Sequence, residues 1–412
     1  MNTDIEKLVL QPDYVIVGCG VSGLYCALNL PEDVSILMLS KDTFETCDSF
    51  LAQGGICVLW DEDDYDAYYN DTMKAGHYEN NPESVEIMIR SSKDLIKDLI
   101  NYGVDFAKDS QGNLIFTKEG AHSKNRIAFH EDITGEEITK KLFAAAKAKP
   151  NIEMMEYTTM YDLIVEDGVC LGIRARDDQS TEYEILAKET ILATGGIGGL
   201  YKHSTNFPIL TGDSLDVAKK YNIQTEHLDY VQIHPTTFYS TASGRRFLIS
   251  ESVRGEGAVL LDKNGNRFCD ELQPRDVVTD EIRKQMKKDR TEYVLLDMRP
   301  IPKETILGHF PHIYEHCLKN GYDVTRECIP VVPAQHYFMG GIKVNSNSHT
   351  SMDRLYAVGE TACNGVHGKN RLASNSLLES MVFAKRAANE IKQHIKNNNT
   401  YFDQEHFKEE FK

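Results

Sequence analysis

The stretch from residue 14 to residue 24, YVIVGCGVSGL, constrains the fold of this chain more than any other segment. Four β-branched or aromatic residues run directly into the pattern G-x-G-x-x-G, and an amphipathic segment over residues 24–30 follows at once. A strand, a glycine turn and a helix in this order form a dinucleotide-binding fingerprint. Gly18 permits a sharp turn, Gly20 leaves room for a pyrophosphate, and Gly23 lets the helix pack closely on the strand. The stretch therefore predicts an α/β, Rossmann-like fold with an adenine dinucleotide at the N-terminus of that helix.

The residues after the next expected strand leave the identity of the dinucleotide open. That strand, expected over residues 34–39, ends in Ser40 and Lys41. Enzymes that use a nicotinamide cofactor more often have an acidic residue here, which binds the ribose 2′-hydroxyl. Because a serine and a lysine suit FAD as well as NAD, the motif alone does not choose between them.

Charge and cysteine content exclude several classes of protein. The 412 residues carry a net charge of -18, which argues against a nucleic-acid partner because such proteins present a basic face. No apolar run reaches the roughly 20 residues of a membrane span, and the N-terminus lacks the apolar core of a signal peptide. The nine cysteines form no C-x-x-C pair. We therefore expect reduced cysteines, no metal site, no membrane partner and a cytoplasmic location.

Further strands and helices follow from the hydrophobic pattern. Strands that end at Gly195 and near Gly359 should join the first strand in one sheet, and an Asp-Gly pair at residues 167–168 predicts a hairpin. Apolar residues at helical spacing predict helices over residues 82–102, 134–147, 274–287, 303–319 and 376–394.

A change in the pattern of expected strands and helices predicts two domains. Between residues 228 and 337, short strands and turns replace the alternation of strands and helices. We predict that this segment is an inserted α+β capping domain. The nucleotide-binding domain is then discontinuous, over residues 1–227 and 338–400, and residues 401–412 form a polar tail.

Two loops allow alternative interpretations. The glycine-rich segment 49–56 is either an ordinary loop or a loop whose backbone amides lie against a flat cofactor ring. Residues 116–130 are either a solvated loop or a segment that carries functional side chains, because they include many ionisable residues and few apolar ones.

The chain resembles the succinate dehydrogenase/fumarate reductase flavoprotein family over nearly its whole length, from Gly18 to Ser380. Glu360, which follows the third glycine-ended strand, suits the hydroxylated ribityl chain of a flavin. The motifs that carry the resemblance are Gln53-Gly54-Gly55 and residues 117–120, 232–236, 250–257, 274–276, 336–341 and 370–377. The resemblance implies an FAD-binding domain of Rossmann type. Family members commonly carry a further C-terminal helical domain, which we expect to be absent here because the chain ends soon after residue 394.

The resemblance also implies which residues bind FAD, and that the cofactor is not covalently attached. Membrane-linked members attach FAD to a histidine four residues before A-x-G-G, and here that position is Asp48, whose carboxylate cannot make the histidyl link. The residues expected to contact the cofactor are Gly18, Cys19, Gly20, Val21, Ser22, Gly23, Lys41, Asp48, Ser49, Phe50, Leu51, Ala52, Gln53, Gly54, Gly55, Asp213, Glu360, Ser376 and Leu377.

Within the family, the greatest similarity is to members that oxidise L-aspartate. This implies oxidation to iminoaspartate, with dioxygen (giving hydrogen peroxide) or fumarate as acceptor, as the first step toward quinolinate and NAD. Because iminoaspartate is unstable in water, quinolinate synthase is a plausible recipient. Arg371 is expected to bind one substrate carboxylate, and His234, His336 and Ser250 the other. Glu119 is expected to contact the amino group.

Arg275 stands in the Pro-Arg-Asp motif, where the family places its proton donor. Arginine keeps its proton at neutral pH, so it suits an acid in fumarate reduction better than a base. We expect Arg275 to stabilise charge during aspartate oxidation, and Glu251 and Arg254 to complete a proton relay with it.

Three other functions stay open at this point. A soluble fumarate reductase or succinate-oxidising flavoprotein is the main alternative. A flavin-binding protein without turnover and a nicotinamide dehydrogenase are weaker ones. The paired arginines and histidines disfavour a flavin-binding protein without turnover. The lack of a second nucleotide motif disfavours a nicotinamide dehydrogenase.

Overall fold

The computed structural model describes residues 7–242 and 244–398, and its centre is a five-stranded parallel sheet. The strand order is β18 (Leu355–Ala357), β11 (Glu189–Leu192), β2 (Tyr14–Val17), β3 (Ile36–Leu39) and β7 (Ile152–Met155). The expected neighbours of the first strand are confirmed, since β11 pairs with β2 and β18 pairs with β11, both in parallel. The chain order reverses beside β2, and ligands of open parallel sheets bind at such a point.

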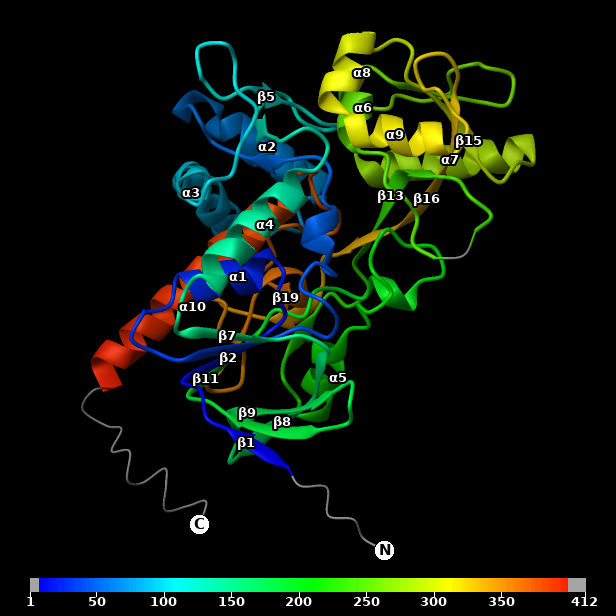
Figure 1. Ribbon diagram of the computed structural model, residues 1–412. Coiled ribbons are helices and arrows are strands. Elements are labelled where there is room, and N and C mark those ends of the chain that lie inside the picture. The colour runs from blue at the N-terminus through cyan, green and yellow to red at the C-terminus, as the bar shows by residue number, and fades with distance from the viewer. Residues whose placement is uncertain (1–6, 243, 399–412) are drawn as a thin grey trace, which may run out of the picture.

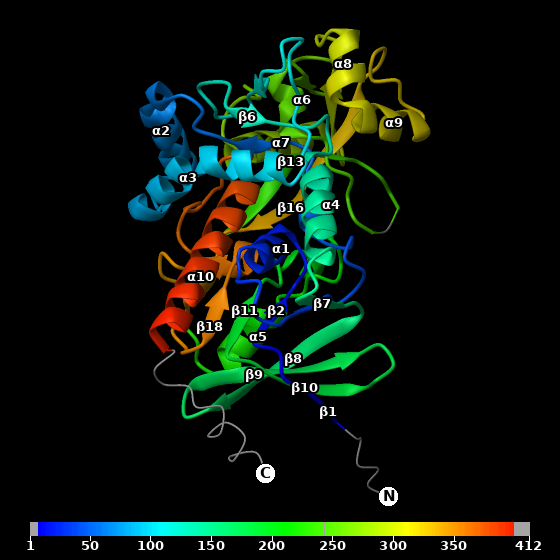
Figure 2. The ribbon, with the colours of Figure 1, turned by 60° about the vertical axis from the view of Figure 1, so that its left-hand side comes forward.

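Alternate side chains of β2 and β3 belong to two different cores, because successive residues of a strand point to opposite faces. Tyr14 and Ile16 pack with the helices on one face, whereas Val15 and Val17 pack on the other. The helices of the first face are α1 (Val21–Leu28), α3 (Pro82–Asn101), α4 (Thr134–Lys147) and α10 (Ser376–Asn398) (Figure 2). This double burial explains why the strands are apolar without alternation.

A mixed sheet, antiparallel except for the parallel pair β1–β10, covers the second face of the parallel sheet. Its order is β1 (Leu8–Leu10), β10 (Glu182–Leu186), β9 (Val169–Asp177) and β8 (Thr158–Glu166). The hairpin predicted at the Asp-Gly pair is confirmed: β8 and β9 flank Asp167 and Gly168, whose φ angles are 47° and 82°. Two positive φ angles in a two-residue turn are what an Asp-Gly pair favours.

The remaining elements outside the inserted region are short. They are β4 (Ile56–Cys57), β5 (Phe116–Thr117) and β6 (Ile127–Ala128) in one sheet, β12 (Thr225–Glu226), β17 (Gly341–Lys343) and β19 (Ala362–Cys363) in another, and helices α2 (Tyr65–Ala75) and α5 (Asp213–Lys220).

The inserted region packs around a third core (Figure 1). We call this region the cap. Its antiparallel sheet has the order β13 (Val231–Phe238), β16 (Ile329–Phe338), β15 (Val294–Asp297) and β14 (Val259–Leu261). Its helices are α6 (Glu251–Gly255), α7 (Arg275–Asp289), α8 (Lys303–His309) and α9 (Pro311–Lys319). The predicted domain limit at residue 337 falls inside β16, so the two regions share a continuous strand.

One local prediction is wrong, and one of the two open interpretations is decided. The single helix expected over residues 303–319 is broken between α8 and α9, because Pro311 has no amide hydrogen and disfavours a helical conformation at Phe310, whose φ is -127°. Residues 116–130 are not a solvated loop: Glu119, His122 and Arg126 are buried, and Arg126 pairs with Asp64 and Asp71.

The predicted polar tail, residues 401–412, lies outside the described residues. Among residues 7–242 and 244–398, no helix combines the length and the apolar character that crossing a membrane would require.

The packing of α1 on β2 makes a testable demand on Gly23. A Cβ atom at Gly23 would lie 2.1 Å from the Gly18 carbonyl oxygen, whereas one at Gly308, in helix α8, would meet nothing within 4 Å. We expect Gly23→Ala to lower the free energy of unfolding by about 1–3 kcal/mol. Gly308→Ala should raise it by up to about 1 kcal/mol. Denaturant unfolding of both variants measures this, and equal effects would contradict the packing argument.

Candidate active site

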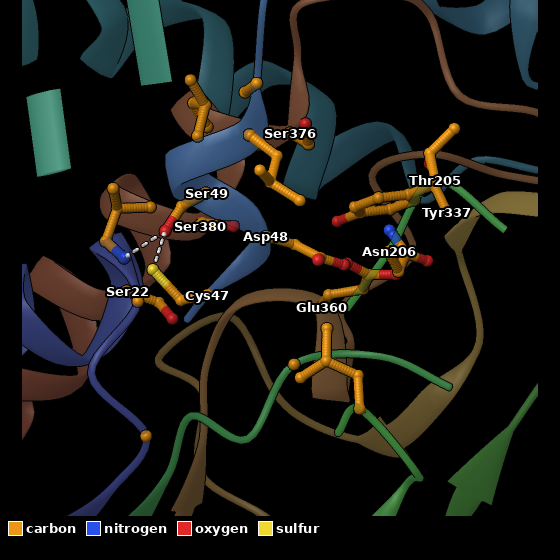
Figure 3. Close-up of a pocket in the computed structure, with 18 of the residues that line it drawn as sticks. Ser22, Cys47, Asp48, Ser49, Thr205, Asn206, Tyr337, Glu360, Ser376 and Ser380 are labelled. Carbon is orange, nitrogen blue, oxygen red and sulfur yellow. Dashed lines mark hydrogen bonds between the residues drawn. The ribbon is translucent and has the colours of Figure 1, made fainter. Parts of the chain in front are cut away.

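A single long cavity joins the carboxyl end of the parallel sheet to the cap. It begins at the β2–α1 turn and ends among side chains of β13, β16, α6 and α7. Figure 3 shows part of its lining, with Asp48, Glu360, Asn206 and Tyr337 directed into the same space. The predicted nucleotide end and the predicted dicarboxylate end therefore belong to one continuous cavity.

The β2–α1 turn presents backbone rather than side chains to the cavity. Gly18 has a φ of 116°, and a Cβ there would lie 2.0 Å from the Ala193 carbonyl oxygen of the neighbouring strand's loop. Gly20 begins α1 without a capping side chain, and the amide of Val21 donates to Ser49 Oγ at 3.2 Å. Helix α1 thus directs its positive end and its first amides toward the cavity, which suits a phosphate.

Lys41 and Asp213, both expected to contact the cofactor, also pair with each other. Lys41 Nζ lies 2.9 Å from an oxygen of Asp213 and donates to Thr211 Oγ1 at 2.8 Å. The pair fixes both side chains at the rim of the cavity.

Asp48 and Glu360 are half-buried acids in the middle of the cavity. Asp48 accepts a hydrogen bond from the amide of Phe207 at 2.9 Å, and burial raises its pKa to about 7. Glu360 accepts one from the amide of Phe338 at 2.9 Å, and burial together with the charge of Asp48 raises its pKa to about 8. Such carboxyl groups exchange readily between donating and accepting a hydrogen bond.

This middle section offers acceptors to a ligand. Three buried oxygens there have no hydrogen-bond partner: Asp48 Oδ2, Gln53 Oε1 and Asn206 Oδ1. Because an unpaired buried polar atom is costly, these oxygens suit a ligand rich in hydroxyl or amide donors.

The far end of the cavity offers donors instead. The Nε2 atom of His234 and the Nε atom of Arg371 are buried without partners. His234 Nδ1 lies 3.1 Å from both the amide nitrogen and the carbonyl oxygen of Thr236, so Nε2 is the ring nitrogen left for a ligand. His336 lies beside it, with ring centroids 5.0 Å apart. Burial and the nearby Arg275 hold the pKa of both histidines well below the ordinary value, so both imidazoles are neutral.

Arg371 is held by contacts on its face and its edge. Its guanidinium carbon lies 4.3 Å from the centroid of the Tyr337 ring, and Nη1 donates to Ser376 Oγ at 2.7 Å. Burial and the charge of Arg275 lower its pKa to about 10, which leaves it protonated at neutral pH. Arg371 is therefore a fixed cation with unused donor capacity.

Arg275 begins a chain of alternating charges. Its Nε donates to Glu251 Oε2 at 2.5 Å, and Nη1 donates to Gln232 Oε1 at 2.8 Å. Glu251 Oε1 lies 3.2 Å from Arg254 Nη2, three residues further along α6. Burial opposes ionisation of Glu251, but the two arginines outweigh it and lower its pKa. Glu251 and Arg254, three residues apart, thus lie on one face of α6.

Glu119 reaches the same end of the cavity from the loop after β5. Its two oxygens accept from Ser252 Oγ at 2.7 Å and from Ser374 Oγ at 2.5 Å. Burial and the charge of Glu251 raise the pKa of Glu119 above its ordinary value. Glu119 is therefore a buried carboxyl group that lines the cavity, and not an acid in a solvated loop.

Three predicted site residues do not line the cavity. Gly23 packs against Gly18, Phe50 lies beneath the Lys140 ammonium at 5.4 Å, and Arg254 lies behind Glu251 with Nη1 on the Glu271 carbonyl. Every other predicted site residue lines it, including Ser250, Leu51, Ala52 and the remaining flavin-loop residues.

Several lining residues were missed in the sequence. They are Thr205, Asn206, Arg245, Tyr337, Ser374 and Ser380. Only Tyr337 and Ser374 stand inside motifs noted above, whereas Thr205, Asn206 and Arg245 lie in segments without a pattern. In the described part of the chain, no cluster of His, Cys, Asp and Glu side chains could hold a metal ion.

Comparison with known proteins agrees with this cavity. A family profile described as an FAD binding domain matches residues 13–377. The chain is 52% identical to the L-aspartate oxidase of Clostridium perfringens over 386 residues, which is 93% of this chain and 88% of that protein. It is 40% identical to that of Neisseria meningitidis, over 92% of this chain and 77% of that protein.

Among solved structures, E. coli quinol fumarate reductase FrdA superimposes with a TM-score of 0.87 and 29% identity, over 93% of this chain and 70% of that chain. A flavocytochrome c3 fumarate reductase superimposes with a TM-score of 0.73 and 25% identity, over 93% and 78% of the two chains. With the matched FAD binding domain and the relatives at 40–52% identity, the chain belongs to the L-aspartate oxidase branch of the succinate dehydrogenase/fumarate reductase flavoprotein family.

Proposed function

We propose that this protein oxidises L-aspartate to iminoaspartate with non-covalently bound FAD and passes the electrons to dioxygen, giving hydrogen peroxide, or to fumarate. The observation that carries the proposal is the far end of the cavity. There Arg275, Arg371, His234 and His336 surround a space that the Glu119 carboxyl group also lines. Two guanidinium groups, one of them paired with Glu251, and two neutral imidazoles beside the Glu119 carboxyl group match two carboxylates and one amino group.

The residues along the cavity fit FAD. The amides at the start of α1 suit the pyrophosphate, and the unpaired oxygens of Asp48, Gln53 and Asn206 suit the donors of the ribityl chain and flavin ring. Asp48 stands where a covalent histidine would be needed, which supports a non-covalent cofactor. When bound, FAD supplies an acceptor for the hydride that leaves the substrate Cα.

The basic end can hold both carboxylates of a four-carbon substrate. Arg371 Nε and His234 Nε2 lack partners, so an incoming carboxylate satisfies them rather than displacing an existing bond. Because both histidines are neutral, they orient a carboxylate without adding charge, and the arginines supply the neutralisation. Oriented this way, the substrate has little freedom to lose in the transition state.

Glu119 gives the site its preference for an amino acid. A carboxylate beside the substrate ammonium favours aspartate over succinate, which has no such group. The raised pKa of Glu119 also suits it to accept a proton from the ammonium group as the imine forms.

In fumarate reduction a proton must be delivered to the substrate, and the chain of Arg275, Glu251 and Arg254 suits this step. Arg275 holds a proton that Glu251 can replace, and Arg254 keeps Glu251 ionised. In aspartate oxidation the same Arg275 stabilises negative charge on the substrate.

We infer a discontinuous FAD-binding domain over residues 1–227 and 338–400 and a capping domain over 228–337, which closes over the substrate. The separate core of the cap supports this division. We also propose a cytoplasmic location, supported by nine cysteines without a disulfide, and transfer of the product to quinolinate synthase in the route to quinolinate and NAD, supported by its instability.

The first test is a visible spectrum of the purified protein. We expect a yellow protein whose oxidised-flavin band disappears when L-aspartate is added without oxygen, and which succinate leaves unchanged. Bleaching by succinate but not by aspartate would favour the fumarate reductase alternative. A yellow protein that neither compound bleaches would contradict both and favour a flavin-binding protein without turnover.

Glu119→Gln tests the selection of the amino group. Loss of the charge that faces the ammonium should lower kcat/KM for L-aspartate by about 30-fold or more. The affinity for succinate as a competitive ligand should stay the same or increase. Glu256→Gln is a matched control, since Glu256 bonds Thr117 on the same side of the cap but does not line the cavity. Equal losses in the two variants would contradict the assigned role.

Arg275→Lys separates the two directions of the reaction. Lysine keeps the charge but cannot bridge Glu251 and Gln232 as a planar fork. Fumarate reduction should fall by about 100-fold or more, as expected for loss of a general acid. Aspartate oxidation should fall by less than about tenfold, as expected for one hydrogen bond. Steady-state rates in both directions decide, and an equal loss would rule out separate roles.

A further inference from the structure

The connection between α2 and α3, residues 76–81, touches the cap through a contact that the proposed chemistry does not use. His77 Nε2 lies 2.7 Å from Asp276 Oδ2. Asp276 directly follows Arg275 in the first turn of α7. The contact therefore links the α2–α3 connection to the helical turn that carries Arg275.

The backbone of this connection is shaped to make the contact. His77 and Tyr78 both have a φ of 58°, in the left-handed region that side chains with a Cβ disfavour. Two consecutive residues persist in this conformation only where surrounding contacts hold them. The amide of Tyr78 donates to the Met73 carbonyl at 2.8 Å, which ends α2 and turns His77 out of the helix.

The same connection is fixed to the segment that carries Arg371. The amide of Asn81 donates to the Gly365 carbonyl at 2.7 Å, and the amide of Lys369 donates to the Gly76 carbonyl at 3.1 Å. Asn370 Nδ2 donates to the Ala75 carbonyl at 3.1 Å. His77 thus has a fixed position relative to Arg371, while Asp276 moves with Arg275.

A second tie supports the first. Tyr230 lies one residue before the start of β13, where the chain enters the cap, and its hydroxyl donates to Glu79. Lys369 Nζ lies 4.0 Å from Glu79 and faces the Tyr230 ring at 5.7 Å. The connection therefore contacts both the entrance of the cap and its α7 helix.

We propose that His77 is a positioning residue: by donating Nε2–H to Asp276, it holds the first turn of α7, and with it Arg275, at a fixed place relative to Arg371. Asp276 Oδ1 is buried without a partner in the described structure, so His77 is the side chain that the Asp276 carboxylate contacts by hydrogen bond. Without the contact, the first turn of α7 loses its tie to the α2–α3 connection, while the ties through Tyr230 and Gln232 remain. This inference rests on the proposed function only in its kinetic consequence.

The test compares His77→Ala and His77→Gln in the FAD-loaded enzyme. Both residues meet the same backbone cost at position 77, but only glutamine keeps a side-chain donor. His394→Ala is the control, because His394 also pairs with a carboxylate, Glu189 at 3.7 Å, and is similarly exposed, 44% against 42% for His77. His394 lies on α10, away from the cap.

We expect His77→Ala to speed amide hydrogen exchange in the first turns of α7, and to lower kcat/KM for L-aspartate, each by about 2–5-fold, as for loss of one partly exposed contact between polar side chains. His77→Gln should recover part of both effects, and the flavin spectrum should not change. Combining His77→Ala with Asp276→Ala should give no further loss, since both remove one contact.

The proposal is overturned if His77→Ala leaves α7 exchange unchanged, if His394→Ala has the same effect, or if the glutamine variant equals the alanine variant. The exchange measurement needs no turnover. If the wild-type enzyme failed to oxidise L-aspartate, the proposed function would fall while the contact would still be tested.

Discussion

The site depends on keeping two guanidinium groups, those of Arg275 and Arg371, buried in one cavity. Burial and, after it, the charge of Arg275 lower the pKa of Arg371. Glu251 compensates Arg275 directly, and the face of Tyr337 supports Arg371. Arg371 Nε and His234 Nε2 still lack hydrogen-bond partners, so a substrate carboxylate completes the arrangement. In a chain with a net charge of -18, these two guanidinium groups provide a local site for an acidic substrate.

The two arginines reach that cavity from different parts of the fold. Arg371 follows the short strand β19 and precedes α10, which packs on the parallel sheet, whereas Arg275 begins a helix of the cap. Gln232, at the start of the cap sheet, accepts from Arg275 and donates to the carbonyl of Arg371 at 2.8 Å. A substrate held by both arginines therefore contacts the cap and the rest of the fold together, and the proposed role of His77–Asp276, outside the cavity, follows from this.

The sequence predicted correctly those elements whose conformation is encoded within a few neighbouring residues. The glycine turn at residues 18–23, the Asp-Gly hairpin at 167–168 and the amphipathic helix over 82–102 all appear where their patterns lie. The predicted helix over 303–319 failed because a proline within a helical pattern permits either a kink or a break, and packing decides between them. The burial of Glu119, His122 and Arg126 was not predictable, because polar residues give no sign of burial until their partners, such as Asp64 and Ser374, are known.

The sequence by itself determined the kind of site this chain carries. Its glycines at residues 18–23 indicate a dinucleotide-binding turn, and its arginines, histidines and acids occur in motifs that follow one another in the same order as in the family. The tertiary structure alone decided how these groups act on one another. It placed Asp48 and Glu360 in one cavity, where burial raises the pKa of both. It also placed Arg254 outside the cavity and against Glu251, and it brought His77 into contact with Asp276, which lies 199 residues away in the chain. The physical reason is that propensity and spacing are encoded over a few residues, whereas desolvation and charge coupling depend on distances that exist only after the chain has folded.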